Sequence, residues 1–142
     1  MQELFFETSR NAKEPEKAHK TDAGYDLFVN SYELIECNDY VKRYSVDTGV
    51  RVAIPDGFTG LVLPRSSISK SGVLTHTGVI DAGYTGIISV FLTVFDDRFA
   101  LFLGQKIAQL VILPLPEFEL TRGKVSAMTT ERGANGFGST GV

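Results

Sequence analysis

The chain has 142 residues, of which 43% are hydrophobic and 22% are charged, and its formal net charge at pH 7 is −3. This length favours one domain, and the acidic balance argues against a basic domain that binds nucleic acid directly. Its one cysteine, Cys37, excludes an intramolecular disulfide and a cysteine-based zinc site. No apolar run reaches the roughly 18 residues of a membrane-spanning helix, and the first residues lack a signal-peptide pattern. We therefore expect a soluble protein of a reducing compartment, without membrane association.

The region before residue 64 has the pattern of short β-strands joined by loops. Residues 11–20 are polar with alternating charge, which predicts a loop. Residues 50–54 alternate between apolar side chains and Arg51 or Ala53, as in a strand with one buried face. Residues 58–63 form the next apolar run and predict a second strand.

The strongest helix signal lies in residues 65–71. This serine-rich segment follows Pro64 and is ended by Gly72. Serine is a favoured residue at helix starts and glycine at helix ends. One short helical turn is expected here and little other helix.

The second half again favours strands. Residues 87–95 are apolar on both alternating faces, which predicts a strand covered on both sides, one of them by another subunit. Asp96-Asp97 predicts a turn, residues 98–103 a returning strand, and residues 106–113 a further strand that ends at Pro114. Ten of the fourteen glycines separate such short runs, a pattern typical of an all-β sandwich or barrel.

The last residues differ from the rest. Residues 129–142 are polar and glycine-rich with one aromatic residue, Phe137, a composition that predicts a flexible segment. The chain is therefore divided into a β-barrel domain, residues 1–128, and a C-terminal arm, residues 129–142.

Four clusters combine carboxylates, hydroxyls, arginine and glycine in predicted loops. They occupy residues 22–27, 64–67, 78–84 and 132–141. In the second, Arg65, hydroxyls and the main-chain amides of a helix start together suit an anion. In the fourth, glycines allow the main chain to approach phosphate closely. Each cluster alone is also compatible with an ordinary turn or, for the fourth, a disordered tail.

In their order and spacing the clusters, together with Gly104–Leu113, resemble the five motifs of the trimeric dUTPase (dUTP diphosphatase) family. The resemblance runs from Asp22 to the C-terminus, and the sequence Arg-Gly-x-x-Gly-Phe-Gly-Ser-Thr-Gly from Arg132 is its most diagnostic part. It implies a jelly-roll-type β-barrel with at most one short helix, assembled as a threefold homotrimer with shared active sites. It also implies Mg²⁺-dependent hydrolysis of dUTP to dUMP and pyrophosphate, which limits uracil incorporation into DNA and supplies dUMP.

The resemblance further implies roles for individual residues. Asp81 would be the general base for the water that attacks the α-phosphorus, Tyr84 would pack on the deoxyribose and exclude a 2′-hydroxyl, and Asp26 would hold Mg²⁺ through water. Phe137 would stack on uracil, whose edge would be read by the main chain of the hairpin 73–79, including Gly78. The phosphate contacts would come from Arg65, Ser66, Ser67, Gln109, Arg132, Gly138, Ser139 and Thr140.

Several positions depart from the family pattern. Thr75 stands where many members have an asparagine that contacts uracil, so a side-chain contact to the base is left open. Ser67 replaces the usual glycine, as in the related dCTP deaminases, and Lys106 replaces the usual arginine. Deaminases carry a catalytic glutamate where this chain has Phe91, which argues against deamination.

Two alternatives to a dUTPase stay open. One is a dCTP deaminase or a bifunctional deaminase and dUTPase, and the other is a non-catalytic, dUTP-sensing regulatory module. A cytoplasmic location is expected, while nuclear entry or a virus-encoded protein in a host cell stays open.

Overall fold

The computed structural model describes residues 1–138 and 141. In that part of the chain the regular structure is almost all β, with one α-helix, α1 (Ser66–Lys70), and one 3₁₀ turn, η1 (Val125–Ala127). The strands are β1 (Phe5–Thr8), β2 (Tyr25–Phe28), β3 (Ser31–Cys37), β4 (Lys42–Asp47), β5 (Val50–Ala53), β6 (Phe58–Leu63), β7 (Val73–Thr75), β8 (Gly78–Ile80), β9 (Ser89–Val94) and β10 (Lys106–Pro114). This content confirms the predicted all-β class with one short helix.

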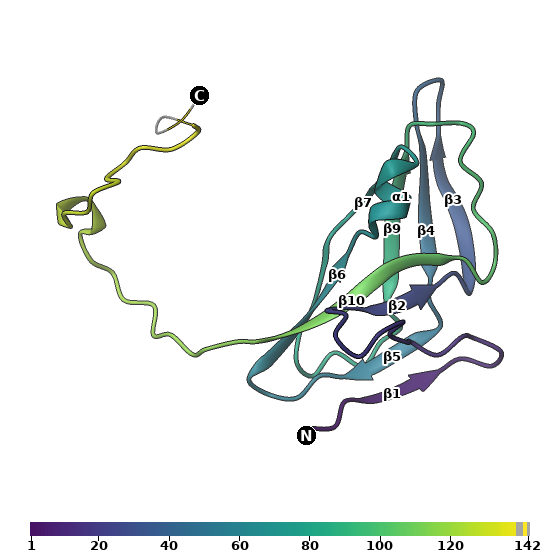
Figure 1. The fold of residues 1–142 in the computed structure, drawn as a ribbon, viewed down its shortest axis with the longest axis horizontal. Coiled ribbons are helices and arrows are strands. Elements are labelled where there is room, and N and C mark those ends of the chain that lie inside the picture. The colour runs from purple at the N-terminus through teal and green to yellow at the C-terminus, as the bar shows by residue number, and fades with distance from the viewer. Residues whose placement is uncertain (139–140, 142) are drawn as a thin grey trace.

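Two four-stranded antiparallel sheets make up the body of the molecule (Figure 1). One has the strand order β2-β10-β6-β8 and the other β3-β4-β9-β7, while β1 pairs with β5 beside them. Fully buried Leu27 and Leu110 of the first sheet share one hydrophobic core with Val46 and Leu92 of the second. Two antiparallel sheets around one core form the predicted jelly-roll-type barrel.

The short helix α1 lies where the sequence predicted it. It follows Arg65, whose main chain is still extended, and Ile68 is its one buried side chain. The chain leaves the helix through Gly72, whose φ of +75° is the left-handed conformation that glycine adopts most easily. The helix therefore projects directly from the end of β6.

The returning strand predicted for residues 98–103 is wrong. The structure has a loop here, because the main-chain groups bond to side chains and not to a neighbouring strand. Gln105 accepts a hydrogen bond from the Phe102 amide over 3.1 Å and donates one to the Ala100 carbonyl over 3.4 Å. At the start of the loop the Asp96 carboxylate accepts a bond from the Arg98 amide over 3.0 Å. The loop is left free to form one wall of a cleft.

Strand β9 is fully covered on one face within this chain and only partly covered on the other. Val90, Leu92 and Val94 are buried on the first face. On the second face Thr93 is buried, whereas Phe91 is 44% exposed and Phe95, just after the strand, is 61% exposed. Cover for the second face by another subunit stays a prediction.

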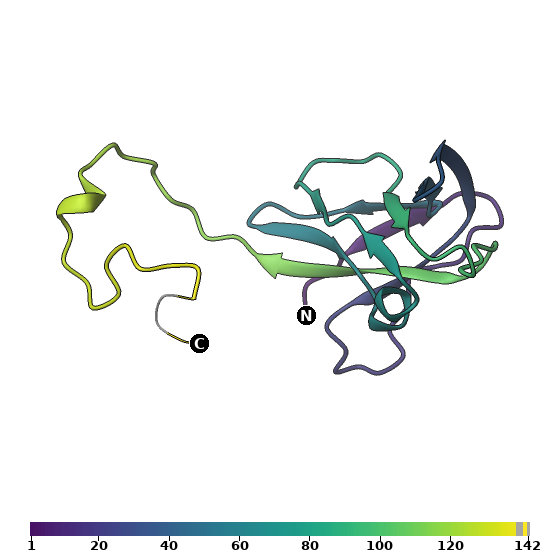
Figure 2. The same cartoon turned by 90° about the horizontal axis from the view of Figure 1, so that it is seen from above.

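Beyond Pro114 the chain leaves the body, and both views show the segment lying apart from it (Figures 1 and 2). Its apolar side chains Leu115, Phe118 and Leu120 are exposed. The predicted division at residue 128 and the predicted flexibility of the arm stay predictions. No helix in the described part of the chain has the length and apolarity needed to cross a membrane.

Candidate active site

Two of the sequence clusters, residues 22–27 and 64–67, meet the motif Gly104–Leu113 in one sheet. Strand β10 lies between β2 and β6, and Gln109 on β10 is opposite Asp26 on one side and Leu63 on the other. Arg65 follows β6 by two residues, at the start of α1. Residues far apart in the sequence are thus brought together by the register of three neighbouring strands.

Asp26 lies between two cationic side chains. Its Oδ1 accepts a hydrogen bond from Arg65 Nε over 3.1 Å, and its Oδ2 lies 3.0 Å from Lys106 Nζ. The Asp26 side chain is only 14% exposed, so the ion pairs are poorly screened by water. Glu16 adds a weaker contact, 3.7 Å from Lys106 Nζ, and pairs its main chain with that of Asp26. These contacts hold the Asp26 carboxylate in one orientation.

Gln109 is fixed by a contact that sequence reasoning missed. Its amide nitrogen donates to the Pro64 carbonyl over 2.9 Å, which ties β10 to the start of α1. Gly24 is buried directly against it, and a Cβ added there would overlap Gln109 Oε1. A side chain at position 24 would therefore displace Gln109, which explains the glycine at this position.

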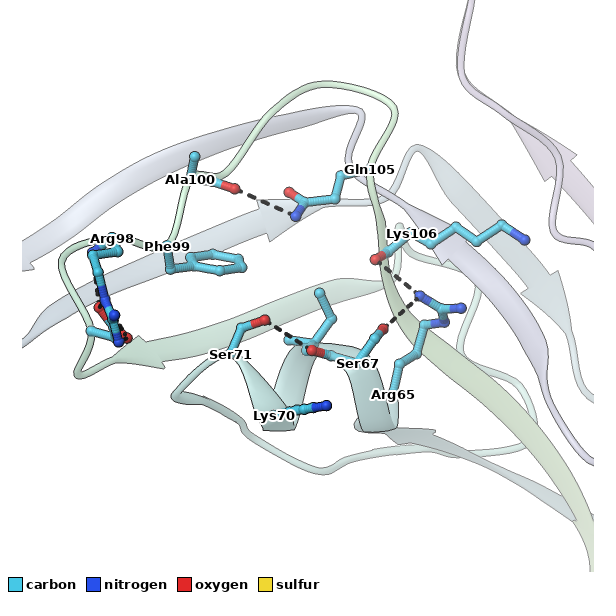
Figure 3. A pocket seen from close by; sticks show the side chains of 11 residues that line it. Arg65, Ser67, Lys70, Ser71, Arg98, Phe99, Ala100, Gln105 and Lys106 are labelled. Carbon is cyan, nitrogen blue, oxygen red and sulfur yellow. Dashed lines mark hydrogen bonds and ion pairs between the residues drawn. The ribbon is translucent and has the colours of Figure 1, made fainter.

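A cleft of about 700 Å³ opens between α1 and the loop 96–106 (Figure 3). Four cationic residues line it, Arg65, Lys70, Arg98 and Lys106, together with one carboxylate, Asp96. Figure 3 shows side chains of α1 on one wall and of the loop on the other. Such a surface suits a polyanion such as a triphosphate.

Arg98 was not among the residues predicted for the site. Its guanidinium lies 2.6 Å from the Asp96 carboxylate, and this hydrogen bond, with a second from the Arg98 amide, lowers the pKa of Asp96 from 3.8 to about 2. The usable signal was the Asp-Asp-Arg sequence, which forms a turn closed on its own side chains. The pair leaves Arg98 partly neutralised at the far end of the cleft.

The hydroxyls predicted to bind phosphate stand at the start of α1. Ser66 and Ser67 are exposed, and Ser67 Oγ accepts a bond from Arg65 Nη1 over 3.3 Å. The cleft is lined by Ser67 but not by Ser66.

Asp81 and Tyr84 lie at the opposite end of the same sheet. They follow β8, whose Ile80 is paired with Gly60 and whose Gly78 is paired with Val62. Arg65 is five residues beyond Gly60, so at about 3.3 Å per residue it lies roughly 15 Å or more from the level of Asp81. A general base acts within hydrogen-bond reach or through one water, so one chain does not bring Asp81 to the Arg65 cluster.

Thr75 does not face the outside of its hairpin. Its side chain is 3% exposed, and Oγ1 has no hydrogen-bond partner in the described part of the chain. The next residue, His76, is fixed instead: its amide donates to the Phe91 carbonyl over 2.9 Å, and Nε2 lies 2.8 Å from Thr93 Oγ1. A side-chain contact from Thr75 to a base is therefore not available in this arrangement.

The residues predicted for the arm lie away from the other clusters. Arg132 Nε donates to the Asn135 carbonyl over 2.8 Å, and both Phe137 and Gly138 have a positive φ, of 53° and 79°. Phe137 is fully exposed. The predicted residues Ser139 and Thr140 lie outside the described residues.

The carboxylates do not form a metal cage. Among residues 1–138 and 141, no three histidine, cysteine or acidic side chains gather as ligands. The Asp26 oxygens already contact Arg65 and Lys106, which leaves them suited to bond a metal's water molecules and not the metal directly. This arrangement fits a magnesium ion that arrives on substrate phosphates.

Comparisons with known proteins point to one family. A family model described as dUTPase matches residues 10–141. The deoxyuridine 5′-triphosphate nucleotidohydrolase of Cutibacterium acnes is 41% identical over 135 residues, which cover 90% of this chain and 85% of that protein. The dUTPase of Staphylococcus bacteriophage 80alpha, solved with dUPNHPP, has a TM-score of 0.82 and 33% identity, with 100% of both chains covered. The dUTPase of phage phi11 of S. aureus, solved as a mutant with a structural Mg(II) ion, has a TM-score of 0.70 and 30% identity over 87% of this chain and 97% of that one.

Proposed function

The chain belongs to the dUTPase family and is a dUTP diphosphatase, and we propose that it hydrolyses dUTP at a site that several copies of the chain build together. In this reaction the oxygen of a water molecule attacks the α-phosphorus. The bond from that phosphorus to the bridging oxygen breaks, and dUMP and pyrophosphate are released.

The observation that carries the proposal is the cationic cleft next to the Asp26 cluster. Arg65 and Lys106 both reach the cleft and both contact Asp26, while Gln109 is fixed on the same sheet. Arginine binds phosphate oxygens through several N–H groups in a fixed geometry, and lysine adds charge. These residues are assigned to the triphosphate, together with the exposed hydroxyls of Ser66 and Ser67.

The chemistry at the α-phosphorus is assigned to Asp81 of another copy. The separation of Asp81 from Arg65 within one chain supports a site that two chains share, as do the exposed aromatic side chains of Phe91 on β9 and of Phe95 just after it. A closed ring of three identical chains provides three equivalent sites of this kind. In each, Asp81 accepts the proton of the attacking water.

The sugar and base are assigned to the same copy as Asp81. The Tyr84 ring is 45% exposed beside Asp81 and is available to contact a deoxyribose. The main chain near Gly78 is the remaining candidate for reading uracil, since the Thr75 side chain is buried.

The arm closes the site in this proposal. Arg132 would pair with the terminal phosphate, Phe137 would stack on uracil, and the main chain of Gly138, Ser139 and Thr140 would wrap the phosphates. The exposure of Phe137 in the free chain supports a role in covering a ligand.

Magnesium is proposed as the cofactor. When bound, the ion neutralises charge on the phosphates and orients them. Asp26 would hold it through water, and the two cations beside Asp26 hold its carboxylate in one orientation.

The test of function is product formation from dUTP, dCTP, dTTP and UTP in parallel. Pyrophosphate release from dUTP alone is the expected result. Release of ammonia from dCTP would instead identify a deaminase, and tight binding of dUTP without pyrophosphate release would identify the regulatory module. The exposed, non-acidic Phe91 at the position of the deaminase glutamate supports the first outcome.

A further inference from the structure

The turn that carries Tyr84 has few attachments to the rest of the molecule. Strands β8 and β9 belong to different sheets, so residues 81–87 cross from one sheet to the other. Within the turn the Tyr84 amide donates to the Asp81 carbonyl over 3.1 Å, and the Tyr84 hydroxyl donates to the Ile87 carbonyl over 3.0 Å. Both bonds are internal to the turn. They set its shape but do not fix its place on the body.

Arg51 supplies a bond from outside the turn. Its Nη1 donates to the Thr85 carbonyl over 2.9 Å. Among the hydrogen bonds that residues 82–87 make within the described chain, this one alone has its donor elsewhere in the sequence. A hollow of about 190 Å³ beside Arg51 and Thr85 separates the turn from the outer edge of β1 and β5. The guanidinium therefore bridges the turn to β5.

The strand pattern explains why Arg51 points this way. In β5, Val50 and Val52 are buried, so Arg51 between them must face outward. The same strand is anchored next to the end of the turn, because the Ile88 amide donates to the Val50 carbonyl over 2.8 Å. Arg51 thus projects from a rigid element and reaches three residues back along the turn.

The Tyr84 ring moves with the main chain that Arg51 holds. The ring lies against Gly86, where an added Cβ would overlap the Tyr84 hydroxyl. Thr85, whose carbonyl accepts the Arg51 bond, stands between these two residues. A displacement of Thr85 consequently displaces both the ring and the surface on which the ring rests.

We propose that Arg51 is a positioning residue that fixes the Tyr84 ring and so sharpens the discrimination between deoxyribonucleoside and ribonucleoside triphosphates. The inference rests on the proposed role of Tyr84 against the sugar. A ring that rejects a 2′-hydroxyl by contact must be held within a fraction of an ångström, because a ring that can retreat admits the hydroxyl. Arg51 supplies this restraint through a charge-assisted hydrogen bond.

The test compares substrate discrimination in Arg51→Met, which keeps most of the aliphatic stem and removes the donors. We expect the ratio of kcat/KM for UTP to that for dUTP to rise about fivefold, the typical net effect of losing one hydrogen bond. Arg51→Lys should give an intermediate ratio, because an ammonium donates but lacks the planar fork. Arg10→Met is the matched control, since the exposed Arg10 makes no side-chain hydrogen bond or ion pair with the described residues.

A second measurement reports the mobility of residues 82–87 and does not depend on enzyme activity. Hydrogen exchange of the amides of residues 82–87 in nucleotide-free protein should become several-fold faster in Arg51→Met and stay unchanged in Arg10→Met. An unchanged exchange rate would overturn the restraint, and faster exchange with an unchanged UTP-to-dUTP ratio would overturn its role in discrimination. If Tyr84→Ala raises UTP use and Arg51→Met does not, the inference about Arg51 fails alone. If Tyr84→Ala has no effect on discrimination, the proposed role of Tyr84 fails, and with it the link from Arg51 to specificity.

Discussion

Arg65 and Asp26 are joined by a bond of 3.1 Å between Nε and Oδ1, although 39 positions separate them in the sequence. Both side chains are mostly withdrawn from water, with 27% and 14% exposed. The pair connects the residue assigned to phosphate with the residue assigned to the metal's water shell. A substitution of Arg65 or of Asp26 should therefore change the position of the other side chain.

Replacing Asp26 by asparagine should weaken the response to magnesium. The amide keeps the shape but loses the charge that favours bonds to metal-bound water, so the Mg²⁺ concentration for half-maximal rate should rise about tenfold. Because Arg65 and Lys106 lose their charged partner, the free energy of unfolding should fall by about 1–2 kcal/mol. Rate against Mg²⁺ concentration and urea unfolding measure the two effects.

Glu16→Gln provides the matched control for this change. Among the described residues the Glu16 side chain pairs with Lys106 alone, over 3.7 Å, and it is 59% exposed, so the Mg²⁺ response and the free energy of unfolding should stay close to wild type. An equal response from the two variants would contradict the assignment of Asp26.

Gly24→Ala should act through Gln109. The added Cβ displaces the Gln109 side chain, which then loses its bond to the Pro64 carbonyl. The KM for dUTP should rise about three- to tenfold, roughly the net effect of losing one hydrogen bond of ordinary strength. Gln109→Ala should show a similar rise, and the double variant should be no worse than either single one, since both remove the same contact. Additive effects in steady-state kinetics would refute this coupling.

A chain that lacks the Arg65 side chain and a chain that lacks the Asp81 side chain should restore activity to each other when they assemble together. Arg65→Ala and Asp81→Ala should each be nearly inactive alone. After the two are unfolded and refolded together, about one quarter of the sites in a mixed threefold ring receive both intact residues from different copies. A matching fraction of wild-type dUTP hydrolysis is the expected result. Persistent inactivity of the refolded mixture, with trimers present by sedimentation, would place all of the site within one chain.

Thr75→Val should stabilise the protein. The valine keeps the shape and removes a buried hydroxyl that has no partner in the described part of the chain, so the free energy of unfolding should increase by about 1 kcal/mol. The KM for dUTP should not change, because the side chain faces the core. A loss of affinity for dUTP would show that the hydroxyl reaches the base after all.

The Asp96 and Arg98 pair should respond to acid. Its hydrogen bonds favour the ionised carboxylate and lower the pKa of Asp96 from 3.8 to about 2. The pairing is therefore complete above a pH of about 4 and is lost as the pH falls towards 2. In Arg98→Met the pKa of Asp96 should return part of the way to 3.8, because the main-chain amide at position 98 still donates. Carboxyl NMR titration measures the midpoint, and an unchanged midpoint would rule out the guanidinium as the main cause.

Local sequence signals predicted the parts of the fold that depend on local physics. The serines and Gly72 placed α1, and the alternation in residues 50–54 identified the buried face of β5. The loop at residues 98–103 was mistaken for a strand, because its apolar alternation gives no sign that Gln105 occupies its main-chain groups.

The residues assigned to the site come from motif spacing, which carries no information on how they meet. Motif spacing identified Asp26 and Arg65 but could not show that they form an ion pair, because strand register across β2, β10 and β6 decides which residues meet. Arg51 belongs to no motif. Its bond to Thr85 follows from the approach of β5 to a turn 34 residues away, which no local pattern encodes.

If two copies share each site as proposed, the distance between Arg65 and Asp81 within one chain also makes the rate depend on enzyme concentration. Under the proposed sharing, each chain contributes Arg65 to one site and Asp81 to another. A single chain therefore hydrolyses no dUTP until it assembles with other copies. Activity per chain should then fall steeply on dilution below the assembly constant. Newly synthesised protein would have no dUTP-hydrolysing activity until its concentration is high enough for the chains to assemble.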